Sequence, residues 1–213
     1  MHIPDGFLDP GVAAAAGAVT VGVVGYSLKR ANEELDDERV PLLGVTAAFV
    51  FAVQMLNFPV AGGTSGHLLG AALAAILLGP WLACLVMAVV LTTQAFMFAD
   101  GGISALGANI LNMGIVGALG AGFLMLLARH LLPRSRTAFL AVVAAGSWLA
   151  VMAGAGATAI ELGISGTVPL GTVLPPMLGV HALIGVGEAV ITVTAVSAVL
   201  ASRPDLVAAG GTA

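Results

Sequence analysis

Residues 11–28 read GVAAAAGAVTVGVVGYSL, an uncharged run long enough for one α-helix to cross the roughly 30 Å hydrocarbon core of a bilayer. Comparable runs follow along the whole chain. Hydrophobic residues make up 59% of the 213 residues, charged residues only 8%, and the mean hydropathy is +1.08. A soluble domain carries about 25% charged residues. The chain is therefore predicted to be an integral membrane protein, and the continuous runs favour helices over the alternating strands of a barrel.

Hydropathy and helix-breaking residues together predict an all-α protein of about seven transmembrane helices. The third helix is short and is separated from the fourth only by Gly79-Pro80, so we expect it to be tilted or to cross incompletely. The predicted helices cover 9–30, 41–57, 67–79, 80–98, 105–132, 137–162 and 172–201.

The seven basic residues predict the orientation of these helices. With seven crossings, all of them fall on one side of the membrane, which the positive-inside bias assigns to the cytoplasm. They are Lys29, Arg30, Arg39, Arg129, Arg134, Arg136 and Arg203. The N-terminus is then outside and the C-terminus cytoplasmic. The acidic cluster from Glu33 to Glu38 is interpreted as a solvated cytoplasmic turn rather than a metal site.

The pattern indicates a single transmembrane domain over 1–203, with a tail at 1–8 and a short cytoplasmic C-terminal tail at 204–213. No basic segment precedes the first apolar run, so we expect no signal peptide and a chain that begins at Met1. Cys84 lies in an apolar span, where neither a disulfide nor redox chemistry is expected. The sequence contains no P-loop, so any use of ATP requires a partner, and neither an organic cofactor nor nucleic acid is expected to bind.

The N-terminal sequence MHIPDGFL places His2 directly after the terminal amine. The amine, the His2 amide nitrogen and the His2 imidazole can bind one metal, closing a five-membered and then a six-membered chelate ring. A fourth nitrogen would complete a square plane, a geometry typical of Ni(II) or Cu(II). His67 is the candidate, because it follows a loop in which Gly62, Gly63 and Gly66 allow the backbone to fold closely around an ion.

Two further features of the outer side bear on this site. Residues Ile3 to Gly6 fit a type I turn that would bring the tail back over the helices. His181 also lies on the outer side, in the last helix, whereas His130 lies in a basic connection and is interpreted as a surface histidine.

Four blocks of this sequence resemble the CbiM/NikM family, the substrate-binding membrane subunits of energy-coupling-factor transporters for cobalt and nickel. They are MHIPDGFL, FAVQMLNFPVAGGTSGHLLG, DGGISALGANILNMGIVG and GVHALIGVGEAVIT, in the same order over roughly 1–195. The resemblance implies that the amine of Met1, the amide and imidazole of His2 and the imidazole of His67 hold the metal. It also implies a membrane coupling subunit, a pair of cytoplasmic ATPases and often a small accessory membrane protein as partners.

Other polar residues in or beside the spans are candidates to line or support the pocket. His181 and Glu188 lie two turns apart on one helix face, and we favour a structural hydrogen-bond role for them over direct metal contact. Asp5, Asp100 and Glu161 either attract cations or form a solvated rim. The remaining candidates are Gln54, Asn57, Ser65, Asn109 and Asn112.

Small residues recur along the first helix at Ala14, Gly17, Ala18 and Gly22, where helices could approach closely or simply pack within the molecule. The eight methionines are spread over many spans, which indicates packing rather than a Cu(I) site.

The predicted function is metal capture for an importer in the cell membrane, not an enzymatic activity. The alternatives are an autonomous channel or secondary transporter and, third, an intramembrane metalloenzyme, for which the HExxH signature is absent. Ni(II) or Co(II) is the expected substrate, with a narrow preference for Ni(II), because a plane of four nitrogens that includes a deprotonated amide suits that ion.

Overall fold

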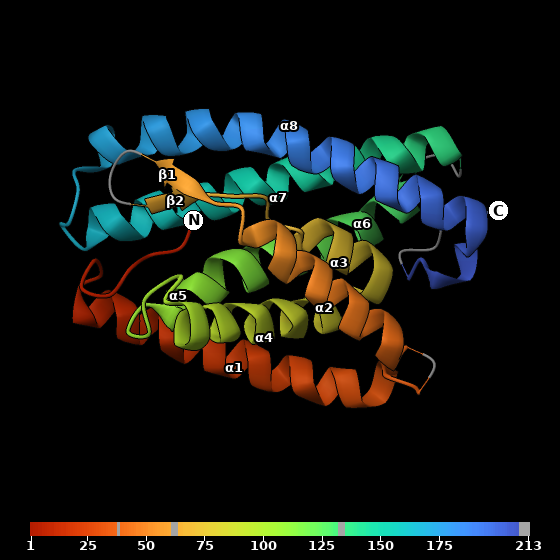
Figure 1. The fold of residues 1–213 in the computed structure, drawn as a ribbon, viewed down its shortest axis with the longest axis horizontal. Coiled ribbons are helices and arrows are strands. Elements are labelled where there is room, and N and C mark those ends of the chain that lie inside the picture. The colour runs from red at the N-terminus through yellow and green to blue at the C-terminus, as the bar shows by residue number, and fades with distance from the viewer. Residues whose placement is uncertain (38, 61–63, 132–134, 209–213) are drawn as a thin grey trace.

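The computed structural model describes residues 1–37, 39–60, 64–131 and 135–208, and these form an almost entirely helical protein (Figure 1). Five of its helices are long and apolar enough to cross a membrane, in agreement with the prediction of a multi-pass membrane protein. The long apolar runs form α1 (Pro10–Glu34), α4 (Pro80–Phe98), a broken helix that begins at Leu106, α7 (Arg136–Ile164) and α8 (Leu170–Ser202). A shorter apolar helix, α2 (Val40–Gln54), follows α1.

The third predicted span is shorter than expected. The helix α3 covers only Ala71–Leu78, so the predicted start at residue 67 was wrong. Its eight residues rise about 12 Å, less than half of the hydrocarbon core. His67 therefore lies in an irregular segment before the helix, and Gly70, with a φ of +72°, forms the N-cap.

The fifth predicted span is broken into three helical types. It consists of α5 (Leu106–Ile110), a π-helix η1 (Leu111–Leu119) and α6 (Gly120–Leu131). Segments of π-helix are rare, and those inside α-helices are frequent at functional sites. This one follows directly on α5, which carries Asn109, and contains Asn112.

The loop after α2 contains a small hairpin that was not predicted. Strand β1 (Phe58–Val60) pairs antiparallel with β2 (Thr64–Gly66), with Phe58 opposite Gly66 and Val60 opposite Thr64. Gly62 and Gly63, which were expected to let this loop fold closely, lie outside the described residues, as do Glu38 and Arg134.

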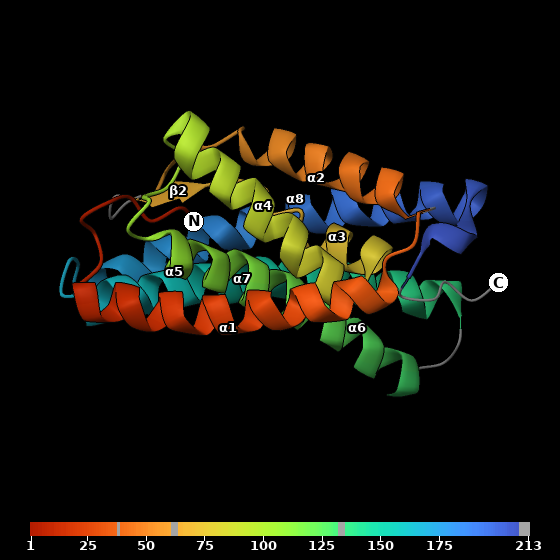
Figure 2. The ribbon, with the colours of Figure 1, turned by 90° about the horizontal axis from the view of Figure 1, so that it is seen from below.

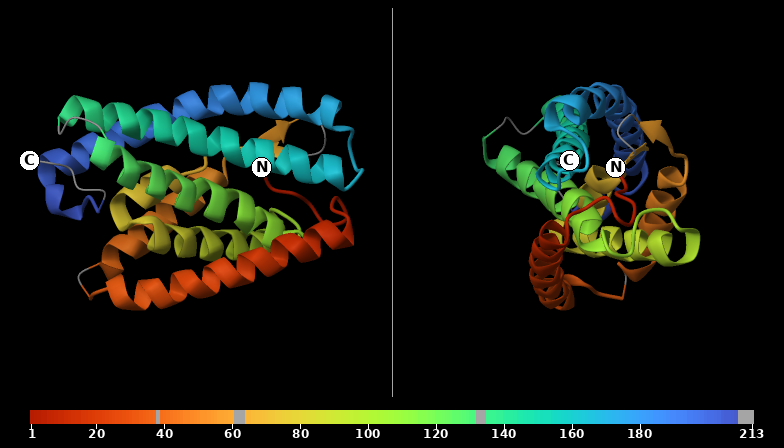
Figure 3. Two further views of the ribbon diagram at one scale, coloured as in Figure 1. Left: turned by 180° about the vertical axis from the view of Figure 1, so that it is seen from behind. Right: turned by 90° about the vertical axis from the view of Figure 1, so that its left-hand side faces the viewer.

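The helices pack lengthwise around a common core. Figure 1 shows α7 and α8 side by side along the molecule, and Figure 2 shows α4 between α1 and α2. The N-terminus lies inside the bundle beside the hairpin, and the end of α8 lies at the opposite end of the molecule (Figure 1). The end-on view in Figure 3 places the N-terminus near the centre of the bundle.

The turn between α1 and α2, at the end of the bundle remote from the hairpin, carries several charged residues. Arg30 forms ion pairs with Glu33 at 2.6 Å and Glu34 at 3.2 Å, and Arg39 lies 3.9 Å from Asp36. These side chains are largely exposed, as expected for a solvated turn. After α8, a short 3₁₀ helix η2 (Pro204–Leu206) leads to Val207, which is buried against the bundle, so the first part of the predicted C-terminal tail is folded.

The small residues of α1 serve two different purposes. Ala14, Ala18 and Gly22 lie on the exposed side of the helix, so they do not pack within the molecule. Gly17 lies against Gly107 of α5: a Cβ built on Gly107 would be 2.5 Å from the Gly17 Cα. Thr20 reinforces this contact by donating a hydrogen bond to the Gly107 carbonyl at 2.7 Å.

Candidate metal centre

The N-terminal tail is threaded into the protein rather than lying on its surface. Met1 and Ile3 are completely buried, and His2 is only 3% exposed. Chain termini are normally among the least ordered parts of a domain. The burial of three consecutive terminal residues therefore indicates a specific position for the tail.

Backbone hydrogen bonds fix that position. The Asn109 amide accepts a bond from the Ile3 N–H at 2.8 Å and donates one to the Ile3 carbonyl at 3.1 Å, as a neighbouring strand would do. The Gly102 N–H also donates to the Ile3 carbonyl, at 2.8 Å. Gly102 has no room for a side chain, because a Cβ there would collide with the backbone of Asp5.

The turn that returns the tail to α1 lies one residue later than predicted. It is closed by a hydrogen bond from the Phe7 N–H to the Pro4 carbonyl at 3.4 Å, and Gly6, its third residue, has a φ of +80°. A positive φ at this place is typical of a type II turn rather than the predicted type I turn over Ile3 to Gly6. The physical reason is that the Ile3 carbonyl is already occupied by Asn109 and Gly102.

Contacts with two outer loops hold this turn. Asp5 accepts hydrogen bonds from the Ser104 N–H at 2.7 Å and its hydroxyl at 2.6 Å, and these bonds lower the pKa of the Asp5 carboxyl. The Thr167 hydroxyl donates to the Phe7 carbonyl. Asp5 therefore anchors the tail and does not face the histidines.

Ser65 of β2 lies against the two terminal nitrogens. The Met1 amine donates to the Ser65 carbonyl and lies 3.3 Å from the Ser65 hydroxyl oxygen. The His2 N–H lies 3.3 Å from the same hydroxyl. The hairpin thus brings the residue two positions before His67 to the start of the chain.

The imidazoles of His2 and His67 face each other across this contact. Their ring centroids are 4.7 Å apart, and His67 is 1% exposed. The Nδ1 of His67 lies 2.8 Å from the Leu68 carbonyl, whereas its Nε2 is buried and has no hydrogen-bond partner among the described residues. The Nε2 of His2 likewise has no hydrogen bond to the described part of the chain and lies 3.8 Å from the Asp100 carboxylate.

Burial keeps these nitrogens in their neutral, metal-binding form. Desolvation lowers the pKa of the Met1 amine to about 4, against the attraction of Asp100. Desolvation and the nearby terminal amine lower the pKa of His2 to about 3. The pKa of His67 lies well below its usual range for the same reasons, with smaller contributions from His2 and His181.

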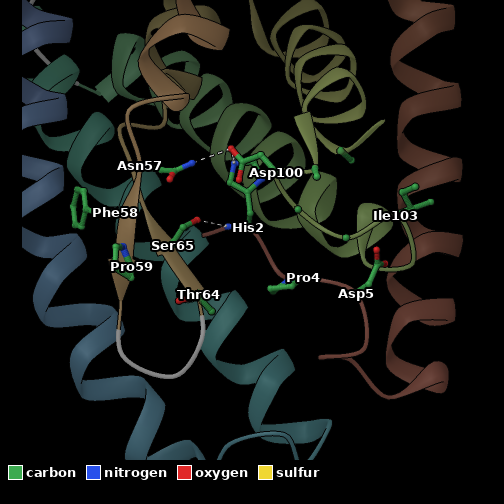
Figure 4. A pocket seen from close by; sticks show the side chains of 14 residues that line it. His2, Pro4, Asp5, Asn57, Phe58, Pro59, Thr64, Ser65, Asp100 and Ile103 are labelled. Atoms are coloured by element: carbon green, nitrogen blue, oxygen red, sulfur yellow. Dashed lines mark hydrogen bonds and ion pairs between the residues drawn. The ribbon is translucent and has the colours of Figure 1, made fainter. Parts of the chain in front are cut away.

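An open cleft of about 680 Å³ leads from the outer surface to His2 (Figure 4). Figure 4 shows Asn57 and Asp100 together above His2, with Ser65 on its other side; the Asn57 amide donates to Asp100 at 3.1 Å. Burial raises the pKa of the Asp100 carboxyl, and the Met1 amine opposes this shift. Of the polar residues predicted near the pocket, Asp5, Asn57, Ser65 and Asp100 line this cleft.

The other predicted pocket residues lie deeper. His181 is fully buried on α8, with its Nδ1 2.7 Å from the Met177 carbonyl and its Nε2 without a hydrogen-bond partner. Asn112 donates a hydrogen bond to Glu161 at 2.6 Å, and both residues are buried. Glu161 therefore does not form part of a solvated rim, which was one of its two predicted roles. Glu188 and Gln54 bind the backbone just after His67 and not a side chain of the cleft.

Three groups contact the histidines or cover the tail, although the sequence did not predict these contacts. These are the Leu68 carbonyl, the Asp100 carboxylate, which was predicted only as an outer charge, and the Gly101–Gly102 backbone that covers the tail. Among the described residues, no three His, Cys, Asp or Glu side chains gather into a metal-binding group.

Residues 2–206 match the family described as the cobalt uptake substrate-specific transmembrane region, CbiM. The chain belongs to the CbiM family. It is also 34% identical, over 97% of its length and 94% of the relative, to the cobalt transport protein CbiM of Sorangium cellulosum.

Other relatives carry nickel in their names. A protein of Archaeoglobus fulgidus, provisionally named a fused nickel transport protein NikMN, is 44% identical over 97% of this chain and 68% of its own. Among solved structures, a truncated transition metal transporter matches with a TM-score of 0.85 and 36% identity, over 94% of this chain and 99% of the other. The sequence thus shows the CbiM family, and the fold is similar to that of a transition metal transporter.

Proposed function

We propose that this chain is the substrate-capture membrane subunit of an ATP-driven energy-coupling-factor importer for Ni(II) or Co(II). The metal is held in a square plane by the Met1 amine, the amide and imidazole nitrogens of His2 and the Nε2 of His67. The observation that carries this proposal is the burial of a neutral terminal amine and His2 next to His67, with His67 Nε2 unpartnered.

The donor set supports a late divalent transition metal. Nitrogen donors in a tetragonal arrangement favour Ni(II) or Cu(II), whereas carboxylate cages favour Mg(II) and Ca(II). Ni(II) is the favoured substrate of the two, because binding through a deprotonated amide stabilises its low-spin form. The names of the relatives, which include cobalt and nickel transport proteins, support the same pair of metals.

The orientation follows from the charges and the cleft. The basic connections lie in the cytoplasm by the positive-inside bias, and the cleft and the tail, at the opposite end of the helices, face outside. This chain contains no nucleotide-binding motif, so the energy is supplied by a pair of cytoplasmic ATPases through a membrane coupling subunit. The name of the fused relative, NikMN, supports an additional small membrane partner.

The direct test is metal binding by a His67→Ala variant. We expect the wild-type protein in detergent to bind about one Ni(II) per chain and the variant to lose most of its affinity, because one of four ligands is removed. His130→Ala is the matched control, since His130 is an exposed histidine remote from the cleft. Unchanged Ni(II) affinity in His67→Ala, with the fold intact, would refute the site.

A further inference from the structure

The segment that carries His67 lies along α8 and is bound to it at several points. Thr64 donates a hydrogen bond to the Met177 sulfur at 3.0 Å, and a Cβ on Gly66 would contact Ile184. Two residues past His67, the backbone reaches Glu188, which lies in the middle of α8 and is only 3% exposed. The irregular backbone around His67 is therefore positioned by side chains of neighbouring helices.

Glu188 binds two successive backbone N–H groups. Its Oε2 accepts from the Leu69 N–H at 2.8 Å, and its Oε1 accepts from the Gly70 N–H at 2.6 Å. A pair of donors aimed at two oxygens suits a carboxylate, which only accepts hydrogen bonds. Leu69 is also held through its carbonyl, because the side-chain amide of Gln54 in α2 donates a hydrogen bond to it at 2.7 Å.

The Leu69 N–H and the Leu68 carbonyl belong to one planar peptide group and, in the trans form, point in opposite directions. The N–H end of this group binds Glu188, and its carbonyl end lies 2.8 Å from Nδ1 of His67. A carbonyl accepts hydrogen bonds only, so it places the imidazole proton on Nδ1 and leaves the Nε2 lone pair free. One rigid peptide group thus connects the buried carboxylate with the imidazole.

We propose that Glu188 is a positioning residue for metal capture, which orients the Leu68–Leu69 peptide group so that His67 presents the lone pair of Nε2 to the metal. The inference rests on the proposed function, because it concerns the same ligand. Metal-bound histidines commonly donate their second N–H to a carboxylate or a carbonyl that fixes the ring. Here the carbonyl is itself fixed by a carboxylate on another helix.

The first test uses the metal-free wild-type protein, labelled with ¹⁵N at histidine. The His67 signals are assigned by their loss in His67→Asn. We expect a single tautomer with the proton on Nδ1. A proton on Nε2, or exchange between the two tautomers, would overturn the proposal whether or not any variant at position 188 folds.

The second test is Glu188→Gln, which keeps the size of the side chain but offers only one acceptor oxygen. Its amide N–H₂ would face one of the two backbone donors, so the peptide group has to turn. Loss of such outer partners typically weakens metal binding about 10- to 100-fold, and we expect a loss of that size together with loss of the single His67 tautomer. Glu161→Gln is the matched control: that buried carboxylate binds Asn112 and not residues 67–70, so affinity and tautomer should stay as in the wild type.

The outcomes separate this inference from the proposed function. If Glu188→Gln binds Ni(II) as tightly as the wild type, or weakens binding with the His67 tautomer unchanged, Glu188 has a merely structural role and the inference is wrong. If His67→Ala itself leaves the affinity unchanged, the proposed function fails, independently of the result for Glu188.

Discussion

At the scale of single residues, the Met1 amine and the His2 imidazole are basic groups that lie buried. Their protonated forms are therefore poorly solvated. Their pKa values fall from ordinary values of 8.0 and 6.5 to about 4 and 3 in the buried tail. Because these folded-state values are lowered, the buried tail is most stable above pH 8. That stability decreases as protons bind the released tail between the ordinary and the lowered values.

Acidification should weaken metal binding, because a metal bound through the deprotonated His2 amide displaces the proton of that amide, whereas the buried amine and His2 imidazole are already neutral between pH 8 and pH 5. We expect the Ni(II) affinity, measured by titration calorimetry in detergent, to fall steadily from pH 8 to pH 5. His130→Ala should show the same profile. An affinity that is flat over this range would point to carboxylate ligands instead.

The sequence predicts which residues could bind a metal, but it does not predict the groups that orient them. The chelating arrangement at His2 follows from covalent connectivity alone, and the role of His67 follows from the family resemblance. The contact of Leu68 with His67, and that of Asn109 with Ile3, depend on where backbone carbonyls and amides point after the tail is buried. No pattern of residue types predicts the directions of these backbone groups.

At the scale of elements, the contact between α1 and α5 controls the position of Asn109 and therefore of the tail. Gly107 of α5 lies against the backbone of Gly17, so Gly107→Ala should push the two helices apart. Overpacking of this kind costs about 1–3 kcal/mol. We expect a lower unfolding temperature in detergent and weaker Ni(II) binding.

Gly17→Ala is the matched control for this contact, because a Cβ on Gly17 would have no neighbour within 4 Å. It should unfold at or slightly above the wild-type temperature, as expected when a helical glycine is replaced without strain. If both variants behaved alike, the close approach of α1 and α5 would be refuted.

Long elements could be predicted and short irregular ones could not. Continuous apolar runs locate α1, α4, α7 and α8 within a few residues. The hairpin, the start of α3 and the π-helix η1 depend on tertiary contacts: β2 is held by the tail and α8, and Gly70 is held by Glu188. Hydropathy alone extends α3 to His67, because it does not detect these hydrogen bonds.

At the scale of the whole molecule, the structure predicts capture without transport by this chain alone. The proposed metal site is reached through the open cleft and is backed by buried residues of the helices, and the sequence contains no nucleotide-binding motif. Vesicles that contain only this protein should bind Ni(II) but not accumulate it, with or without ATP. A metal-sensitive dye inside the vesicles measures this. If Ni(II) enters these vesicles down its concentration gradient faster than it enters vesicles with the His67→Ala variant, the protein is a channel instead.

The membrane class and the family could be predicted at this scale, because composition and ordered motifs extend over most of the chain. The insertion of the terminus into the centre of the bundle could be anticipated only through the family resemblance (Figure 3). Its physical basis is the set of bonds from Asn109, Gly102 and Ser65, which come from three separate parts of the chain.

The central claim, that the terminal amine is a metal ligand, is tested most directly by adding one residue ahead of Met1. The extension keeps His2 and His67 but moves the amine away from them, and mass spectrometry establishes both N-termini. To show that the fold is retained, the metal-free extended protein should unfold at a temperature close to that of the native chain. We predict about one Ni(II) per native chain and almost none in the extended chain. Equal binding by the two proteins would contradict the account.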